Sequence, residues 1–282
     1  MAYLLIVINV FAGLAEGIFI KQYNTRHVHG GFVFTGIISL FAMLYFVLTD
    51  AGAFVVTPVL VPYAAISGIL YCVASVLTYF ALACGSFAMS MLVLSYSILF
   101  SIGYGTIFLG EPVTTFSLIG FALLLVSLYL TRGNSMGGKV SVKWLVLIIL
   151  SAVANGMYGI VIRIQQIRFE GAYDNECMAL CLGLSTAFLF AVGVFTEGKH
   201  IKEIVRYGVP YAMGAGLING FRNMLSILVY TMMPISLSSA LTSGIKIVVS
   251  FAVSALLFKE RFLKRQIVGV IVGAFALVFL NI

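Results

Sequence analysis

The sequence contains few charged residues. Lys, Arg, Asp and Glu together make up 9% of its 282 residues, whereas 62% are hydrophobic and the mean hydropathy is strongly positive. Soluble domains carry about 25% charged residues, so this balance excludes an ordinary soluble domain. We therefore expect an integral membrane protein that has the lipid bilayer as its surroundings.

Residues that support catalysis or metal binding are also scarce. The sequence has no P-loop, no metal-ligand cluster and no nucleophile with an obvious base, and its three histidines, His27, His29 and His200, fall in expected loops. The four cysteines lie inside apolar stretches, where we interpret them as small packing residues rather than as a disulfide framework. We expect no enzymatic activity, no cofactor and no bound metal.

Apolar runs of about 20 residues recur along the whole chain. Each is long enough for one helical crossing, because a helix rises about 1.5 Å per residue and the hydrocarbon core is about 30 Å thick. The first run lacks a basic leader, so we expect it to be a retained span. The pattern predicts ten transmembrane helices, at residues 3–21, 31–49, 62–83, 86–108, 114–131, 143–164, 175–195, 207–231, 235–258 and 264–281.

The two halves of the chain resemble each other. Residues 61–64 read Val-Pro-Tyr-Ala, and the same four residues recur 148 positions later at 209–212. Further matches are Gly68 with Gly216, Glu111 with Glu260, Gly120 with Gly269, and Ala15-Glu16-Gly17 with Ala154-Asn155-Gly156. Such self-similarity indicates a duplicated unit. We predict a first five-helix repeat at 1–131, a linker at 132–142 and a second five-helix repeat at 143–282.

An odd number of crossings makes the second repeat enter the membrane from the opposite side. The expected fold is thus all-α, with two inverted repeats whose interface lies near the bilayer midplane, where secondary transporters commonly bind substrate. Most loop cations follow the odd-numbered spans, so the net charge of +7 reports topology rather than nucleic-acid binding. The positive-inside rule places both termini outside the cytoplasm. The lack of long loops and glycosylation sequons fits a bacterial inner membrane.

Two short elements follow the fourth and the ninth predicted spans, Gly110-Glu111-Pro112 and Lys259-Glu260-Arg261. Together with the internal repeat, they make essentially the whole chain resemble the drug/metabolite transporter superfamily in its ten-helix, EamA-like form. This resemblance implies a ten-helix secondary transporter. Members of that group are associated with amino acids, metabolites and drugs of several charge types.

Residues 243–249 are similar to the ninth-helix segment of triose-phosphate and nucleotide-sugar carriers in the same superfamily. The resemblance implies that Lys246, which matches a lysine of those carriers, contributes to anion binding. In triose-phosphate carriers an arginine follows that lysine, whereas Ile247 follows it here. This departure argues against phosphate specificity and is compatible with a general anion site.

Lys246 is also the only charge in the apolar run 235–258. A charge near the bilayer centre costs about 2.5–3.5 kcal/mol on insertion scales, so it usually faces a polar interior. Residues three or four apart share a helix face, and polar stripes with this spacing occur on the first, sixth, eighth and ninth spans. The stripes predict one central cavity with these binding residues: Lys246, Arg222, Asn219, Asn223, Ser243, Tyr96, Glu16 and Asn155.

Charge is unevenly distributed over this expected cavity. Arg222 and Lys246 are both deep, and Glu16 is the only comparably deep acid. An unpaired cation in a low-dielectric site is costly without a counter-ion, which a substrate carboxylate or phosphate would supply. Two interpretations of Glu16 stay open: a functional site, or a structural partner of Arg222 or Lys246. Arg163 lies nearer a helix end and is interpreted as an interfacial anchor.

The favoured hypothesis is a secondary transporter that moves a small organic anion, or a zwitterion such as an amino acid, by alternating access. Its coupling partner is a proton or a counter-substrate, and a monomer suffices because ten helices already form a complete inverted pair. The main alternative is a proton-coupled exporter of cationic or amphipathic compounds that uses Glu16. A third hypothesis is a non-transporting membrane scaffold or sensor.

Overall fold

The computed structural model describes residues 1–26, 30–49, 57–110, 114–131, 141–259 and 262–280. These residues form helices joined by short connections, and none of them forms a strand, so the predicted all-α class is confirmed. Glu111 and Glu260, which belong to the two short sequence elements, lie outside the described residues, as do residues 132–140 of the predicted linker.

Helices of the first half overlap the first five predicted spans. They are α1 (Ala2–Arg26), α2 (Phe32–Thr49), α3 (Val61–Cys84, after a 3₁₀ turn at Pro58–Leu60), α4 (Phe87–Leu94), α5 (Ile98–Phe108) and α6 (Thr115–Thr131). The second half overlaps the other five. Its helices are α7 (Val142–Arg168), α8 (Asp174–Glu197), α9 (Ile201–Met232, after a 3₁₀ turn at Gly198–His200), α10 (Ile235–Leu257) and α11 (Lys264–Leu280).

Seven helical stretches in the described part of the chain are long and apolar enough to cross a membrane, which makes this a multi-pass membrane architecture. One of them, Asp174–Met232, contains both α8 and α9 in 59 residues. Two further helices, α6 and α11, have 17 residues each, slightly fewer than the ~20 residues of a typical crossing. The count of ten crossings therefore stays a prediction.

The predicted span at 86–108 is interrupted in its middle. A 3₁₀ turn at Ser95–Ser97 separates α4 from α5. The Ser95 hydroxyl donates a hydrogen bond to the Met91 carbonyl, 2.9 Å away, and such bonding back to the preceding turn bends helices. The Ser95 carbonyl accepts a hydrogen bond of 3.4 Å from the Ser243 hydroxyl of α10. This break changes which side chains of the segment face the protein interior.

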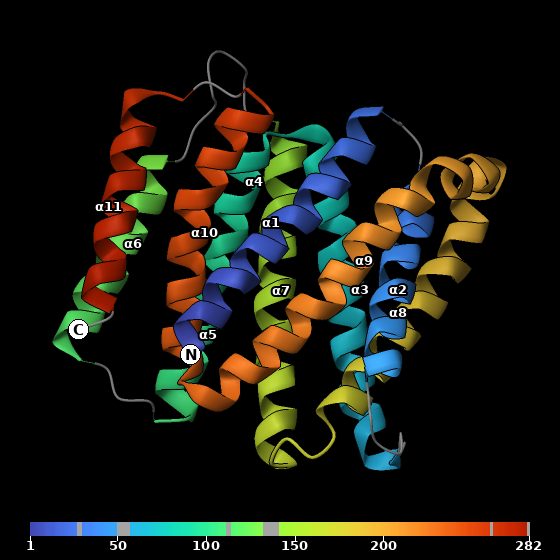
Figure 1. Ribbon diagram of the computed structural model, residues 1–282, viewed down its shortest axis with the longest axis horizontal. Helices are drawn as coiled ribbons and strands as arrows, with labels where there is room; N and C mark the ends of the chain where they lie inside the picture. The colour runs from blue at the N-terminus through green and yellow to red at the C-terminus, as the bar shows by residue number, and fades with distance from the viewer. Residues whose placement is uncertain (27–29, 50–56, 111–113, 132–140, 260–261, 281–282) are drawn as a thin grey trace.

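The helices pack in pairs around α1, α9 and α10. Figure 1 shows α1 and α9 running side by side through the middle of the molecule, with α10 next to them and the α6–α11 pair at one edge. Helix α1 packs on α9 and α3 packs on α7, while α2 contacts both α8 and α9. Helix α10 contacts α1, α4 and α5. The polar faces of α1, α9 and α10 therefore meet inside the bundle.

An aromatic cluster fills the bundle near the C-terminal end of α1. The rings of Tyr23 and Phe34 stack with centroids 4.1 Å apart, and Tyr79 and Tyr211 lie against them. Tyr23, Phe34 and Tyr79 are all buried. Arg26 donates a hydrogen bond of 2.7 Å to the Tyr211 hydroxyl from the outer side of this cluster. The cluster thereby closes this end of the interior.

Candidate functional site

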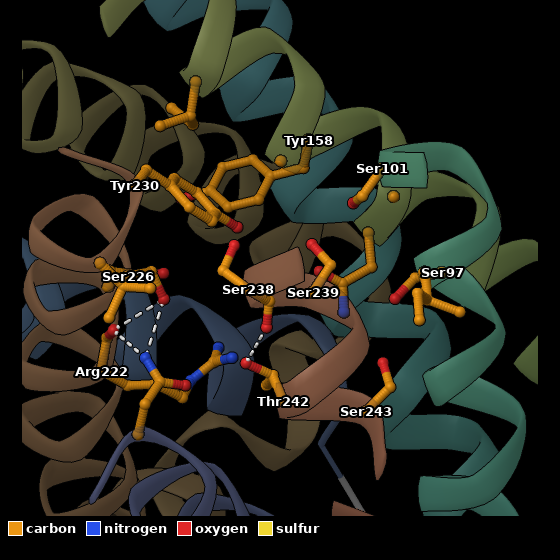
Figure 2. Close-up of a pocket in the computed structure, with 18 of the residues that line it drawn as sticks. Ser97, Ser101, Tyr158, Arg222, Ser226, Tyr230, Ser238, Ser239, Thr242 and Ser243 are labelled. Atoms are coloured by element: carbon orange, nitrogen blue, oxygen red, sulfur yellow. Dashed lines mark hydrogen bonds between the residues drawn. The ribbon is translucent and has the colours of Figure 1, made fainter. Parts of the chain in front are cut away.

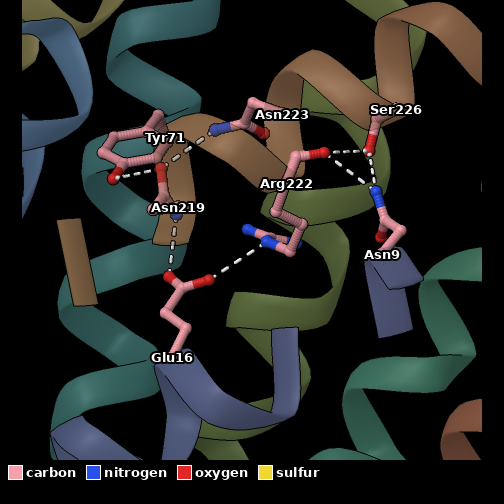
Figure 3. A network of polar contacts seen from close by, with 7 residues as sticks. All are labelled: Asn9, Glu16, Tyr71, Asn219, Arg222, Asn223 and Ser226. Atoms are coloured by element: carbon pink, nitrogen blue, oxygen red, sulfur yellow. Dashed lines mark hydrogen bonds and ion pairs between the residues drawn. The ribbon is translucent and has the colours of Figure 1, made fainter. Parts of the chain in front are cut away.

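An ion pair joins α1 to α9 at the centre of the bundle. One carboxylate oxygen of Glu16 lies 3.0 Å from Nε of Arg222, and the other accepts a hydrogen bond of 2.7 Å from the Asn219 side chain (Figure 3). Both ionic side chains are largely buried, with 15% of Glu16 and 29% of Arg222 exposed. Of the two partners that the sequence left open for Glu16, the structure selects Arg222.

Asn219 extends this contact into a network. Its side-chain oxygen accepts hydrogen bonds from Asn223, at 2.9 Å, and from the Tyr71 hydroxyl, at 3.3 Å. Asn219 and Asn223 are only 2% and 6% exposed. Asn219 therefore holds the Glu16 carboxylate in place, and its role is to position a charged neighbour.

Two residues of α1 fix the position of Arg222. The Asn9 side chain donates hydrogen bonds of 2.8 Å to the Arg222 carbonyl and to the Ser226 hydroxyl (Figure 3). Gly13 leaves room for the arginine stem, because a Cβ atom at this position would lie 3.1 Å from Cδ of Arg222. The guanidinium is thus held across α1 while its outer nitrogens remain beside the cavities.

Two interior cavities meet at this cluster. One, of about 150 Å³, lies toward the N-terminal end of α1 and includes Ile6 in its lining, while the other, of about 90 Å³, extends toward Ile20 and the aromatic cluster. Six residues line both: Leu94, Asn155, Tyr158, Arg222, Asn223 and Lys246. A ligand at Arg222 and Lys246 would therefore touch both cavities.

Lys246 differs from Arg222 in its partners. Its side chain is half-buried and lines both cavities, yet within the described part of the chain it has no hydrogen bond or ion pair. Glu16 is engaged by Arg222 and Asn219, so it leaves the amine without a carboxylate. Among the described residues, the junction of the two cavities thus carries two cations and one paired acid.

Hydroxyl groups dominate the larger cavity. Figure 2 shows those of the 3₁₀ turn, α5, α9 and α10 gathered around it: Ser97, Ser101, Ser226, Ser238, Ser239, Thr242 and Ser243. Ser95 of the same turn also lines this cavity. Some of them are bound to backbone carbonyls of their own helix, such as Thr242 to Ser238. In the described part of the chain, Ser97, Ser101 and Ser239 make no hydrogen bond to the protein. They remain available to water or to a polar ligand.

The predicted site residues gather with one exception. Lys246, Arg222, Asn223 and Asn155 line both cavities, Glu16 and Asn219 line the smaller one, and Ser243 lines the larger one. The exception, Tyr96, lines a separate apolar groove on the outer side of α4 and α5. The prediction for Tyr96 was wrong because it assumed a continuous α-helix, whereas the 3₁₀ turn has three residues per turn and shifts the face.

Two further positions differ from the sequence interpretation. Arg163 was interpreted as an interfacial anchor, but it donates hydrogen bonds of 2.9 Å to Gln166 and 2.8 Å to the Tyr230 carbonyl. That carbonyl belongs to the last turn of α9, which lacks partners within its own helix. Ser97 and Ser101 were missed as lining residues, although their spacing of four in an apolar run was a usable signal.

The described residues contain no cluster of metal ligands. No group of three or more His, Cys, Asp or Glu residues there is arranged to hold an ion. Among the cysteines, Cys72, Cys177 and Cys181 are buried as free thiols, and Cys84 is exposed. The chemistry available at the junction is therefore ion pairing and hydrogen bonding.

Comparisons with known proteins inform the fold. No protein-family model and no curated protein sequence matches the chain. One similar solved structure is described only as a crystal structure of a protein. The alignment covers 100% of this chain and 98% of that structure's chain, with a TM-score of 0.71 and 14% sequence identity. At this identity the similarity shows the fold alone: a solved structure shares the arrangement of helices over nearly its full length.

Proposed function

We propose that this protein is a secondary transporter of the drug/metabolite transporter type, which moves a small organic anion or zwitterion by alternating access. The observation that carries the proposal is the pair of polar cavities that meet at Arg222 and Lys246 inside an apolar helical bundle. A polar interior of this kind is costly in a membrane protein and commonly marks a substrate pathway. A scaffold or sensor has no evident need for it.

Helix packing supports two inverted five-helix repeats. In the two repeats, α1, α2 and α3 correspond to α7, α8 and α9. The contact of α1 with α9 therefore has its counterpart in that of α7 with α3, and the contact of α2 with α9 in that of α8 with α3. Both pairs are present. Ser95 and Ser243, which are 148 positions apart, also touch each other through a hydrogen bond, as two equivalent residues do beside a two-fold axis. Rocking of one repeat against the other is the motion that such symmetry permits.

Charge supports an anionic or zwitterionic substrate over a cationic one. A carboxylate or phosphate between Arg222 and Lys246 would complete the charge balance of the junction, and arginine offers a forked donor where lysine offers a point charge. The carboxylate of Glu16, which the exporter alternative requires, already has two protein partners. The hydroxyl-rich lining of the larger cavity favours a hydrophilic ligand over a hydrophobic drug.

Exchange of one substrate for another is the transport mode that this charge balance favours. Without a ligand, the occluded state would enclose two cations and only one acid, and this net positive charge is costly in a low-dielectric interior. With an anion bound, the charge is balanced. The proposed location is a bacterial inner membrane, because the sequence lacks long loops and glycosylation sequons. The distribution of loop cations favours an orientation with both termini outside the cytoplasm.

The first test is a thermal-shift screen of the detergent-purified protein against organic anions, amino acids and organic cations, with Lys246→Gln and Glu16→Gln in parallel. A ligand at 100 times its dissociation constant stabilises the folded state by about 2.7 kcal/mol. We expect stabilisation by anions or amino acids that is lost in Lys246→Gln. Positive ligands then enter counterflow assays in proteoliposomes.

Other outcomes of the screen distinguish the alternatives. Stabilisation by cations that disappears in Glu16→Gln would replace the proposal with a proton-coupled exporter. Stabilisation by no compound class, together with no flux in proteoliposomes, would favour the scaffold or sensor. A ligand that binds equally well to the native protein and to Lys246→Gln would show that the junction is not the binding site.

A further inference from the structure

An apolar groove runs along the outer side of the bundle, between the α4–α5 segment and α7. Its volume is about 730 Å³, within the range of ~300–1,000 Å³ that ligand pockets occupy. Leu92, Tyr96 and Phe100 form one wall, and Ile149 and Val153 form the other. Among the described residues, none lines both the groove and either of the two central cavities. It faces the region where the hydrocarbon of the membrane lies.

The length of the groove corresponds to one leaflet. On α7 its lining extends from Trp144 to Val153, which is about 14 Å along a helix with a rise of ~1.5 Å per residue. Half of a hydrocarbon core of ~30 Å is nearly the same distance. Trp144 lies in the first turn of α7, which begins at Val142, so this end of the groove is at the end of the helix. The groove therefore reaches from one membrane surface to about the midplane.

Basic residues mark the end of the groove at that surface. Arg265 lines the groove itself, and its Nε donates a hydrogen bond of 3.2 Å to the Leu130 carbonyl, which holds the side chain beside the groove. Lys143 precedes Trp144 in the chain and Lys264 precedes Arg265, and both are exposed. The groove thus combines an apolar length of one leaflet with positive charge at its surface end.

We infer that this groove binds an anionic phospholipid, with an acyl chain along α7 and the phosphate at Arg265. A hollow in the lipid-facing side must be filled by hydrocarbon. Burial of the acyl chains does not select one lipid class from another, because the chains of all classes are apolar. Selection comes from the head group, and basic pockets between transmembrane helices bind anionic head groups. The positive end supplies that selectivity.

The bound lipid packs on the wall of the central cavity. In the 3₁₀ turn at Ser95–Ser97, Ser95 and Ser97 face the larger cavity while Tyr96 faces the groove. A chain in the groove therefore supports the interrupted segment from outside. The lipid site is independent of the proposed transport function, because its occupancy is measured without any substrate.

The experiment compares protein in nanodiscs of phosphatidylcholine with protein in nanodiscs that also contain phosphatidylglycerol of the same chains, followed by native mass spectrometry of the lipid retained in detergent. We expect preferential retention of phosphatidylglycerol. Arg265→Gln lowers that preference about five-fold, since a basic residue near an anionic surface contributes about 1 kcal/mol. Lys202→Gln, an exposed lysine at the start of α9, leaves the preference unchanged.

A second pair of variants tests the apolar part. Val153→Phe fills the groove from an exposed position and lowers retention of both lipids. The same substitution at Val194, an exposed residue of α8 outside the groove, leaves retention unchanged. Equal retention of both lipids by the native protein would overturn the inference. So would an equal effect of Arg265→Gln and Lys202→Gln, because general surface charge would then explain the selectivity.

Discussion

Lys246 and Arg222 are two cations with different surroundings. Arg222 is paired with Glu16, and its backbone is tied to Asn9, whereas the amine of Lys246 has no protein partner in the described part of the chain. Removing one partner of a buried ion pair leaves the other charge uncompensated, whereas a charge that is already unpaired in the interior opposes folding. The two residues should therefore respond differently to removal of their charge.

Lys246→Gln is expected to weaken anion binding while raising the stability of the ligand-free protein. A hydrogen bond to a charged group contributes about 1.5–3 kcal/mol, so affinity falls roughly 10- to 100-fold. Stability without ligand rises on the order of 1 kcal/mol because a costly charge is removed. Thermal unfolding with and without ligand measures both effects. Lower stability without ligand would indicate a structural role for Lys246.

Glu16→Gln is expected to destabilise the protein by about 2–3 kcal/mol. Breaking a buried ion pair typically costs about 3–5 kcal/mol, and the effect is smaller here because both side chains are partly exposed. The double variant Glu16→Gln with Arg222→Gln recovers part of the loss, since neither charge is then left alone. A double-mutant cycle of thermal unfolding gives the coupling. Additive losses would contradict a stabilising pair.

At the level of helices, small residues decide how closely the elements approach. Gly216 on α9 packs against α2, where an added Cβ would lie 2.5 Å from the Ile38 carbonyl oxygen. Gly68 on α3 packs against α8 in the same way, with a distance of 3.1 Å to the Cys181 carbonyl oxygen. The sequence paired these two glycines, and the structure gives them corresponding neighbours.

Alanine at these glycines is expected to destabilise in a fixed order. Gly216→Ala costs about 1–3 kcal/mol because backbone must move, and Gly68→Ala costs less. Gly103→Ala is the matched control, since in the described part of the chain no atom beyond the backbone of its own helix turn and its chain neighbours lies within 4 Å of its added Cβ. A helical alanine gains about 0.5–1 kcal/mol over glycine. Thermal unfolding in detergent ranks the three variants. A Gly216→Ala protein as stable as Gly103→Ala would contradict the close packing.

The whole molecule has its two cavities on opposite sides of the Arg222–Lys246 junction. Ser239 lines the cavity toward the N-terminal end of α1, and Ser75 lines the one next to the aromatic cluster. Tyr23 is 1% exposed within that cluster. Access to the two cavities should therefore differ between the two faces of the membrane.

In a background with Cys84→Ser, which removes the exposed thiol, Ser239→Cys should react with a membrane-impermeant reagent added on the side of the N-terminus. Ser75→Cys should react slowly from either side, and Tyr23→Ala should speed its reaction from the other side. Reaction rates in oriented vesicles measure this. Transported substrate should slow the labelling of Ser239→Cys. Equal rates at both positions from both sides would contradict two separated cavities.

Much of this architecture could be predicted from the sequence. Apolar runs of membrane length predicted the helices, because backbone groups in a bilayer must be satisfied within the helix. Polar stripes with spacings of three and four predicted the inward faces of Asn219, Asn223 and Lys246, and of Glu16 and Asn155 on the first and sixth spans. These features depend on local periodicity and on the environment of the chain, which the sequence itself specifies.

Other features depend on contacts between segments far apart in the chain. The sequence left two cationic partners open for Glu16, and only the packing of α1 against α9 determines that it pairs with Arg222. Lys246 is then left without a partner in the described part of the chain. Tyr96 points outward because the helix is interrupted where α10 approaches Ser95. The sequence by itself determined which residues are helical and polar. The tertiary structure decided which of them meet, because helix crossing and local breaks set the direction of each side chain.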